Sequence, residues 1–155
     1  MSEKELPEIS VRPAEPNDID DLLDLLKILF SIEIDFTFND TVQREGLRLM
    51  LEDKASRAVM VAEYGGQVIG MATVQSHIST ASGAAVGIIE DVVVKQSFRG
   101  RGVGKKLLDE IEAWAKQHGM KRVQLLADRT NDPALKFYDS LQWTPTRLVC
   151  LMKYF

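Results

Sequence analysis

The sequence predicts a mixed α/β domain in which a twisted, mixed sheet of about six to seven strands is flanked by about four helices. A Gly-Gly pair separates two β-rich runs, residues 57–64 and 67–76, as in a two-residue hairpin. Over residues 87–127 an apolar strand, a glycine-rich loop, an amphipathic helix and another strand follow one another, which is the order of a crossover between parallel strands. With 155 residues, 45% of them hydrophobic, the chain can bury the core of one domain, residues 1–155.

The first half of the chain predicts two helices between short strands. Residues 8–14 form a strand, and residues 15–30 form a helix because Pro16 suits a first turn and leucines recur at helical spacing. Residues 41–53 form a second helix, although Gly46 lies inside it. The hairpin of residues 57–76 follows.

The second half predicts two strand-helix pairs and a closing strand. Residues 87–94 are largely apolar, so this strand lies inside the sheet. The next helix begins near Val103 and ends at Gly119, and residues 122–127 form a strand. Residues 131–141 form a short helix with Asp132 as N-cap and Pro133 at its first position. Residues 146–155 form the last strand.

Composition limits the function classes. A net charge of −4 disfavours general attraction to nucleic acid or to an anionic membrane, so any anion site must be local. Cys150 is the single cysteine, which fits a reducing compartment. The start of the chain is polar, and we expect residues 1–8 to be flexible and the protein to be cytoplasmic. His77 and His118 lack metal-ligand spacing, so we expect no metal.

The stretch QSFRGRGVGKKLL, residues 96–108, combines three glycines with basic residues at the start of a helix. Free N–H groups at a helix N-terminus bind phosphate, and glycine lets the phosphate approach the main chain. Alternatively, the glycines serve only a tight turn and the basic side chains are solvated. A P-loop is excluded because Lys105 is not followed by Ser or Thr, and the glycine order differs from the dinucleotide fingerprint.

The same loop, with Arg99, Gly102 and Gly104 in RGRGVG, resembles the pyrophosphate signature of the GNAT family of N-acetyltransferases. The preceding IIEDVVV and the later NDPALKFYDSLQW also resemble segments of that family, at matching separations. The resemblance runs from about Ile9 to the end of the chain. It departs at Gln142 and Trp143, where the family usually has Gly and Phe.

This resemblance implies transfer of an acetyl group from acetyl-coenzyme A to an amine. It places pantetheine along the backbone of the strand and the pyrophosphate at the loop that follows. The coenzyme-binding residues implied are Val92, Val93, Val94, Arg99, Gly100, Arg101, Gly102, Val103, Gly104, Lys105, Asn131 and Lys136. Arg101, Lys105, Lys106 and Lys136 are the open candidates for the remaining phosphate. Asn131 either contacts pantetheine or caps its helix.

The chemistry requires groups that handle protons. A carboxylate can remove the ammonium proton, and Glu90 is our choice because IEDVVV resembles the LEDFFV-type strand of the spermidine/spermine acetyltransferases. Side chains alternate along a strand, so Asp91 should face the other way, although Asp91 or a water stays an alternative. Tyr138 resembles the tyrosine that protonates the leaving thiolate, or else it is a core aromatic. Cys150 should be buried and inert, so transfer is direct.

The acceptor site is expected in residues 31–40, which offer Glu33, Asp35 and Phe36 for substrate binding, with Asp40 and Phe38 nearby. Acids with aromatics suit a cationic amine, and ordinary loop packing is the alternative. We expect a small polyamine, diamine or aminoglycoside-like acceptor. An amino acid, a protein lysine or an N-terminus is the next candidate, and a non-catalytic acyl-coenzyme A sensor is the alternative of another class. Partners are acetyl-coenzyme A, the amine and a second copy of the chain, without nucleic acid or membrane.

Overall fold

The structure, a computed structural model, describes residues 7–155 as two compact units. The first unit ends at Gln124 and the second runs from Leu125 to Phe155. The sequence predicts a flexible segment at residues 1–8. Of these, residues 1–6 lie outside the described part of the chain. Among the described helices, none has the length and apolar character needed to cross a membrane.

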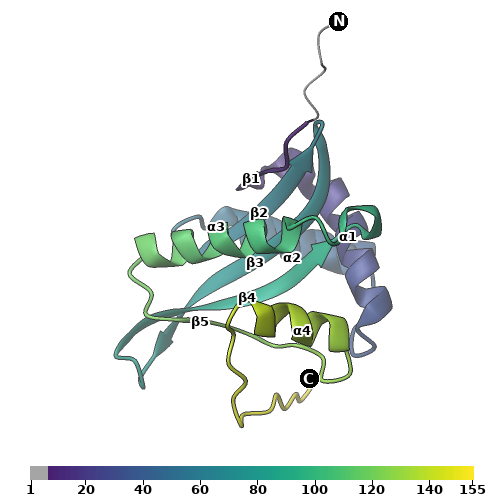
Figure 1. Ribbon diagram of the computed structural model, residues 1–155. Helices are drawn as coiled ribbons and strands as arrows, with labels where there is room; N and C mark the ends of the chain where they lie inside the picture. Colours follow the sequence, from purple (N-terminus) through teal and green to yellow (C-terminus); the bar gives the residue numbers. More distant parts are fainter. Residues whose placement is uncertain (1–6) are drawn as a thin grey trace, which may run out of the picture. The chain divides into compact units, whose positions relative to one another are not determined.

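The first unit contains most of the secondary structure (Figure 1). Five strands form one sheet in the order β1-β2-β3-β4-β5. The first four belong to this unit, and β5 spans the boundary between the two units. Four α-helices are present in the described residues, as expected, but the sheet has five strands in place of six to seven. The elements in chain order are β1 (Ser10–Pro13), η1 (Pro16–Asp18), α1 (Ile19–Ile32), α2 (Asp40–Glu52), β2 (Arg57–Tyr64), β3 (Gln67–Ser79), β4 (Ala84–Val94), η2 (Gln96–Phe98), α3 (Val103–Gln117), β5 (Val123–Leu125) and α4 (Asp132–Ser140).

Two hairpins build the centre of the sheet. β2 and β3 pair antiparallel around Gly65 and Gly66, whose φ angles of 57° and 78° confirm the predicted turn. β3 continues to Ser79, beyond its predicted end, and turns into β4, with which it also pairs antiparallel. The turn between β3 and β4, residues 80–83, has a weaker signal, since it contains a single glycine, Gly83.

Helices cover both faces of this sheet: α1 and α2 lie behind it and α3 in front of it in Figure 1. The leucines of α1 are buried against Val59 and Val61 of β2, as the helical stripe predicted. On the other face, a Cβ on Gly70 of β3 would lie 3.2 Å from Leu107 of α3. Gly70 therefore allows α3 to pack closely on the sheet, and this fixes the helix whose start carries the glycine loop.

The second unit contains α4 and the C-terminal segment. The N-cap of α4 is Asn131, whose side-chain oxygen accepts from the N–H of Ala134 at 3.2 Å, so the prediction of Asp132 was wrong. Gln142 follows α4 with φ of 68°, a conformation that favours glycine. Gln142, which stands where the family usually has glycine, therefore still takes the left-handed conformation.

The strand predicted for residues 146–155 is absent, and β5 is shorter than residues 122–127. A strand needs a paired neighbour for its backbone groups, and no backbone ladder involves residues 144–155 in the described chain. Cys150 is exposed, not buried as predicted, because the segment that carries it joins no sheet of the described residues.

Candidate active site

The N-terminus of α3 is open. Gly100 and Gly102 have φ of 75° and 78°, and no atom lies within 4 Å of the place a Cβ would occupy on either residue. The first helical hydrogen bond runs from Lys106 N–H to Gly102 O at 3.1 Å. The N–H groups of the three residues before Lys106 therefore have no helical partner, and the space in front of them can admit an anion. This arrangement fits a pyrophosphate group.

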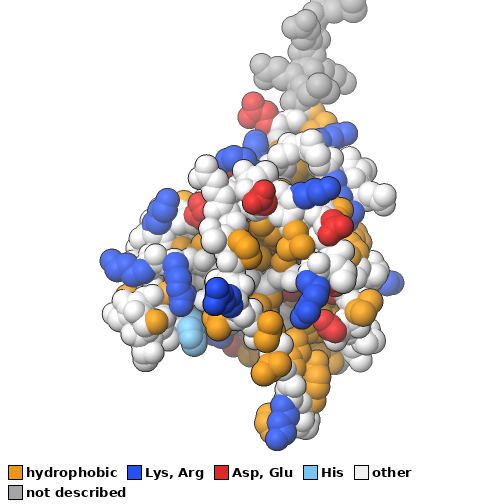
Figure 2. Space-filling model, turned by 60° about the horizontal axis from the view of Figure 1, so that its bottom comes forward, with side chains coloured by type: hydrophobic (Ala, Val, Ile, Leu, Met, Phe, Trp, Pro, Cys, Tyr) orange, Lys and Arg blue, Asp and Glu red, His pale blue; other side chains and the backbone are white. Residues whose placement is uncertain are grey.

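The basic side chains of the loop are partly committed. Arg99 donates from Nε to Val94 O at 3.1 Å, which ties the loop to the end of β4. Lys105 pairs with Asp109 at 2.6 Å, so the positive field expected from the sequence is reduced there. Arg101 lies 5.1 Å from the ring centre of Phe98. On the face drawn in Figure 2, Lys and Arg side chains are scattered, and several lie beside Asp or Glu side chains.

Lys106 donates to Ile9 O at 3.0 Å, which links α3 to the residue before β1. Two of the four candidates for the remaining coenzyme phosphate therefore already have partners. Lys106 donates to a main-chain oxygen, and Lys105 donates to the carboxylate of Asp109. Arg101 makes no ion pair within the described residues. Of the three candidates in the loop, it is the one whose cationic group has no oxygen partner among the described residues.

A β-bulge interrupts β4 at the acidic pair. Val93 pairs with Met71 and Glu90 pairs with Thr73, so Asp91 and Val92 together stand opposite one residue of β3. Asp91 has φ of 54°, which is rare for a residue with a side chain. The strict alternation that assigned Glu90 and Asp91 to opposite faces therefore does not hold here.

The two acids of the bulge differ in environment. Glu90 is exposed, whereas Asp91 is partly buried and 3.3 Å from the hydroxyl of Thr73. Burial first, and then the charges of Glu90 and Glu33, raise the pKa of Asp91 to about 6. A carboxyl group with this pKa is largely ionised at neutral pH and can take up a proton readily.

Val93 has a buried side chain and belongs to the core beneath α1, while Val92 and Val94 are half-buried. The residues predicted to run along pantetheine therefore form a fixed piece of main chain. Its position is set on one side by the β3 ladder and at its end by Arg99.

The predicted acceptor segment joins α1 to α2. Glu33 directly follows α1 and lies near enough to Asp91 for its charge to act on that carboxyl group. Phe36 is 42% exposed and packs against Phe30, with ring centres 5.6 Å apart. Asp35 is exposed, and nothing in the described residues brings it into the same cluster. The ring of Phe38 faces the ammonium group of Lys27 at 6.0 Å.

Three predicted site residues belong to the second unit. Asn131 caps α4, which is the structural alternative weighed from the sequence. Tyr138 is half-buried, and its ring packs against Phe137 and Trp143 at centre distances of 5.2 and 5.9 Å. Lys136 is exposed. Their predicted roles toward the coenzyme stay predictions.

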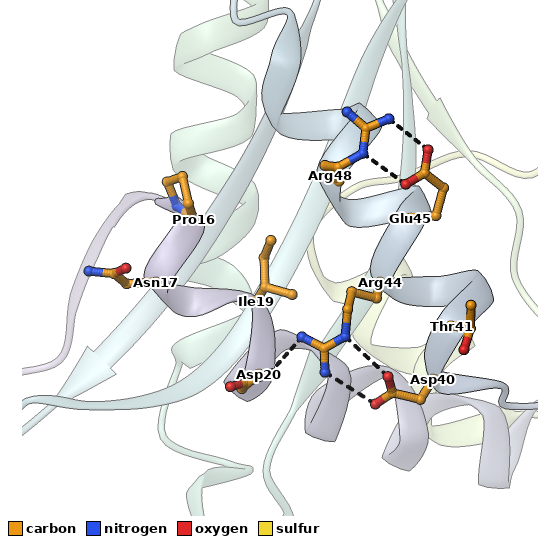
Figure 3. Close-up of a pocket in the computed structure, with 9 residues that line it drawn as sticks. All are labelled: Pro16, Asn17, Ile19, Asp20, Asp40, Thr41, Arg44, Glu45 and Arg48. Atoms are coloured by element: carbon orange, nitrogen blue, oxygen red, sulfur yellow. Dashed lines mark hydrogen bonds and ion pairs between the residues drawn. The ribbon is translucent and has the colours of Figure 1, made fainter.

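A separate pocket of about 900 Å³ opens between η1, the start of α1, and α2 (Figure 3). Arg44 points between Asp20 and Asp40, with N–O distances of 2.8 and 3.1 Å. Arg48 is paired with Glu45 at 2.6 Å. Asp40 of the predicted acceptor segment lines this pocket, but its carboxylate is paired with Arg44, and none of Glu33, Asp35, Phe36, Glu90 or Asp91 lines it.

Thr73 is a site residue that sequence reasoning missed. It lies in the middle of β3, in a run typical of any buried strand, and its side chain contacts both residues of the acidic pair. No spacing or motif marks it, because the contact depends on the register between β3 and β4. Within residues 7–155, no group of three or more His, Cys, Asp or Glu side chains could hold a metal ion.

Comparison with known proteins gives a consistent family. The family described as the acetyltransferase (GNAT) family matches residues 19–142. An uncharacterized N-acetyltransferase of Archaeoglobus fulgidus is 27% identical over 133 residues, which are 85% of this chain and 90% of that protein. A glucosamine 6-phosphate N-acetyltransferase of Trypanosoma brucei brucei is 36% identical over 77 residues, about half of each chain, at 49% and 50%.

Solved structures share the fold. A structure of aminoglycoside N-acetyltransferase AAC(6')-Iy in complex with coenzyme A superposes with a TM-score of 0.86 at 19% identity, covering 99% of both chains. At this identity the likeness concerns the fold alone. It agrees with the mixed α/β architecture.

Proposed function

Because this chain belongs to the acetyltransferase (GNAT) family, we propose that it transfers an acetyl group directly to a primary amine of a small cationic molecule. The family makes the chain an N-acetyltransferase with acetyl-coenzyme A as co-substrate. The proposal concerns the acceptor and the roles of individual residues. The observation that carries it is the acidic bulge of β4, which stands one short loop before the open N-terminus of α3.

The coenzyme supplies the activated acetyl group as a thioester. The N–H groups of Val103, Gly104 and Lys105 hold its pyrophosphate, an assignment supported by their lack of helical partners and by the open space at Gly102. Pantetheine runs along the main chain of residues 92–94, and N–H groups near Val92 stabilise the charge that develops on the acyl oxygen. Arg101 meets the remaining phosphate.

Asp91 is the general base, with Glu90 as the second candidate. Burial supports Asp91, because it raises the pKa toward neutrality, where a base works efficiently. The exposed Glu90 and the nearby Glu33 add negative charge, which attracts the substrate ammonium group. In this scheme Asp91 accepts the ammonium proton before the nitrogen attacks.

Tyr138 donates a proton to the departing thiolate, and Asn131 contacts pantetheine in addition to capping α4. The motif around α4 supports the first role, as does the capacity of a phenol to donate a hydrogen bond. The exposed Cys150 has no histidine near it in sequence, so direct transfer is favoured over an acyl-enzyme.

A cationic acceptor is supported by the negative charge at this point, where Glu33 and Glu90 both act on the carboxyl group of Asp91. Two matched proteins are by name acetyltransferases of an aminoglycoside and of glucosamine 6-phosphate. Three like charges would repel a phosphorylated sugar and attract a polyamine, a diamine or an aminoglycoside. We also propose that the chain is an acetyltransferase of the spermidine/spermine type, which the IEDVVV strand resembles.

An amine panel tests the function. Release of coenzyme A thiol is measured with a diamine, a polyamine, an aminoglycoside, glucosamine 6-phosphate, an amino acid and a lysine peptide. All amines are tested at the same concentration and the same pH. We expect turnover with the multiply charged amines and little with the phosphorylated sugar. Preference for glucosamine 6-phosphate would overturn the acceptor class. Acetyl-coenzyme A binding in calorimetry, without turnover of any amine, would identify a sensor.

We also propose a homodimer, for which the exposed hydrophobic side chains of the C-terminal segment are the support. The cytoplasmic location expected from the sequence stays a prediction.

A further inference from the structure

Thr73 lies within hydrogen-bond distance of both residues of the acidic pair, Glu90 and Asp91. Its side chain is buried, with 3% exposure, although it carries a hydroxyl group. The hydroxyl oxygen lies 2.9 Å from the main-chain oxygen of Glu90 and 3.3 Å from Oδ2 of Asp91. Among the described residues, no other group makes a hydrogen bond to the Asp91 carboxyl group.

A hydroxyl group has one hydrogen and two lone pairs, so Thr73 can donate fully to only one of these oxygens. The Glu90 carbonyl can only accept. When Asp91 is protonated, Thr73 donates to Glu90 O and the carboxylic acid donates to Thr73, so both contacts are satisfied. When Asp91 is ionised, the hydroxyl donates to the carboxylate, and this stronger, charge-assisted hydrogen bond favours the ionised form although the Glu90 carbonyl loses its donor.

The charges around Asp91 make its ionised form depend on the hydrogen bond from Thr73. Glu90 on the same strand and Glu33 at the end of α1 both disfavour the ionised form, as does burial. No described cation from β3, α1 or α3 pairs with Asp91, and Thr73 alone among its neighbours favours the carboxylate. A hydrogen bond to an ionised group is about twice as strong as one between neutral groups.

We propose that Thr73 is a positioning residue whose hydroxyl alternates between the Glu90 carbonyl and the Asp91 carboxylate, and so couples the bulge to the proton state of the base. The proposal rests on the proposed role of Asp91. When the amine is bound and Asp91 is ionised, Thr73 turns to the carboxylate and orients it. When Asp91 has taken the proton, the hydroxyl donates to Glu90 O again, as in the structure.

The test is the titration of Asp91 in the full chain without ligand, followed by carboxyl ¹³C NMR and assigned with Asp91→Asn. Thr73→Val keeps the shape of the side chain and removes the hydroxyl. We expect it to raise the pKa of Asp91 by about one unit, equivalent to about 1.4 kcal/mol, and Thr73→Ser to restore the original value. The lower limb of the kcat/KM profile against pH should move with it.

Thr41→Val, on the exposed start of α2, is the control and should leave the titration unchanged. If Thr73→Val does not fold, Thr73→Cys supplies a weak donor of similar size and should give a smaller shift in the same direction. An unchanged or lowered pKa of Asp91 in the folded Val or Cys variant would overturn the proposal. Since NMR reads the carboxyl group directly, this result is distinguishable from failure of Asp91 as a base, which only the kinetics of Asp91→Asn would reveal.

Discussion

At the residue scale, two adjacent acids of β4 have different surroundings although they are chemically alike. The bulge turns Asp91 out of the regular strand, with φ of 54°, while Glu90 keeps its ladder position opposite Thr73 and stays exposed. Such a conformation costs about 1–3 kcal/mol and is typical of functional positions. The difference between the two side chains follows from this one irregularity and gives two predictions.

The first prediction concerns proton removal. Asp91→Asn keeps the shape and loses the base, so turnover at neutral pH should fall by about 10² to 10⁴. The defect should shrink at high pH, where more of the amine is already deprotonated. Turnover is measured against pH with the best amine of the panel. Glu90→Gln is the matched control and should change KM for a cationic amine more than kcat; the larger pH-dependent defect in this variant would return the base to Glu90.

The second prediction concerns stability. The pKa of Asp91 is raised from 3.8 to about 6, so folding opposes its ionisation. The penalty is full above pH 6 and absent below pH 3.8, and a shift of this size corresponds to at most about 3 kcal/mol. Asp91→Asn should therefore raise the free energy of unfolding at pH 7, and the gain should vanish near pH 4. Urea unfolding at both pH values measures it, and an equal effect at both would refute the assigned pKa.

At the element scale, the loop and α3 act as one unit. Gly100 and Gly102 take the left-handed conformation, and the helix that follows is held on the sheet through the close approach at Gly70. The free N–H groups at the helix start are thus fixed in space by the packing of the whole helix. An anion bound there meets donors that need no rearrangement.

The third prediction follows. Gly102→Glu should weaken acetyl-coenzyme A binding about 10- to 100-fold in calorimetry, because a carboxylate would occupy the place of the pyrophosphate. Gly102→Asn tolerates the left-handed conformation without charge and should lose less. Gly46→Glu, in α2, adds the same group where nothing lies within 4 Å and should leave affinity unchanged. Full affinity in a folded Gly102→Glu variant would make the loop assignment wrong.

At the scale of the whole molecule, the C-terminal segment is unusual. Leu148, Leu151 and Tyr154 are 87%, 89% and 78% exposed, and the segment pairs with no strand within residues 7–155. Contiguous exposed apolar side chains mark interaction surfaces in folded proteins. The proposed second copy of the chain would remove them from water.

The fourth prediction tests this. Sedimentation velocity should show a dimer for the wild type, and Leu148→Asp with Leu151→Asp should give a monomer, because two charges would be buried without partners. Ile34→Asp, at a residue that is 91% exposed in another segment, is the control and should stay dimeric. A wild type that is monomeric at all concentrations would remove the homodimer from the proposal.

The sequence by itself determined the parts that depend on local patterns. The Gly65-Gly66 hairpin, the helical stripe of α1, and the glycine loop before α3 each follow from turn chemistry or spacing within a few residues. The family resemblance, and with it acetyl transfer, came from motifs of the same local kind. Such features are written in consecutive residues, so one chain is enough to see them.

Only the tertiary structure decided which acid of the pair is buried, what Thr73 contacts, and that residues 146–155 form no strand. The bulge at Asp91 arises from the register of β4 against β3, and the raised pKa arises from burial and from Glu33, which lies far away in sequence. The C-terminal segment has strand-forming residues but no partner strand in the described chain. Register, burial and pairing are relations between distant segments, and no local pattern specifies them.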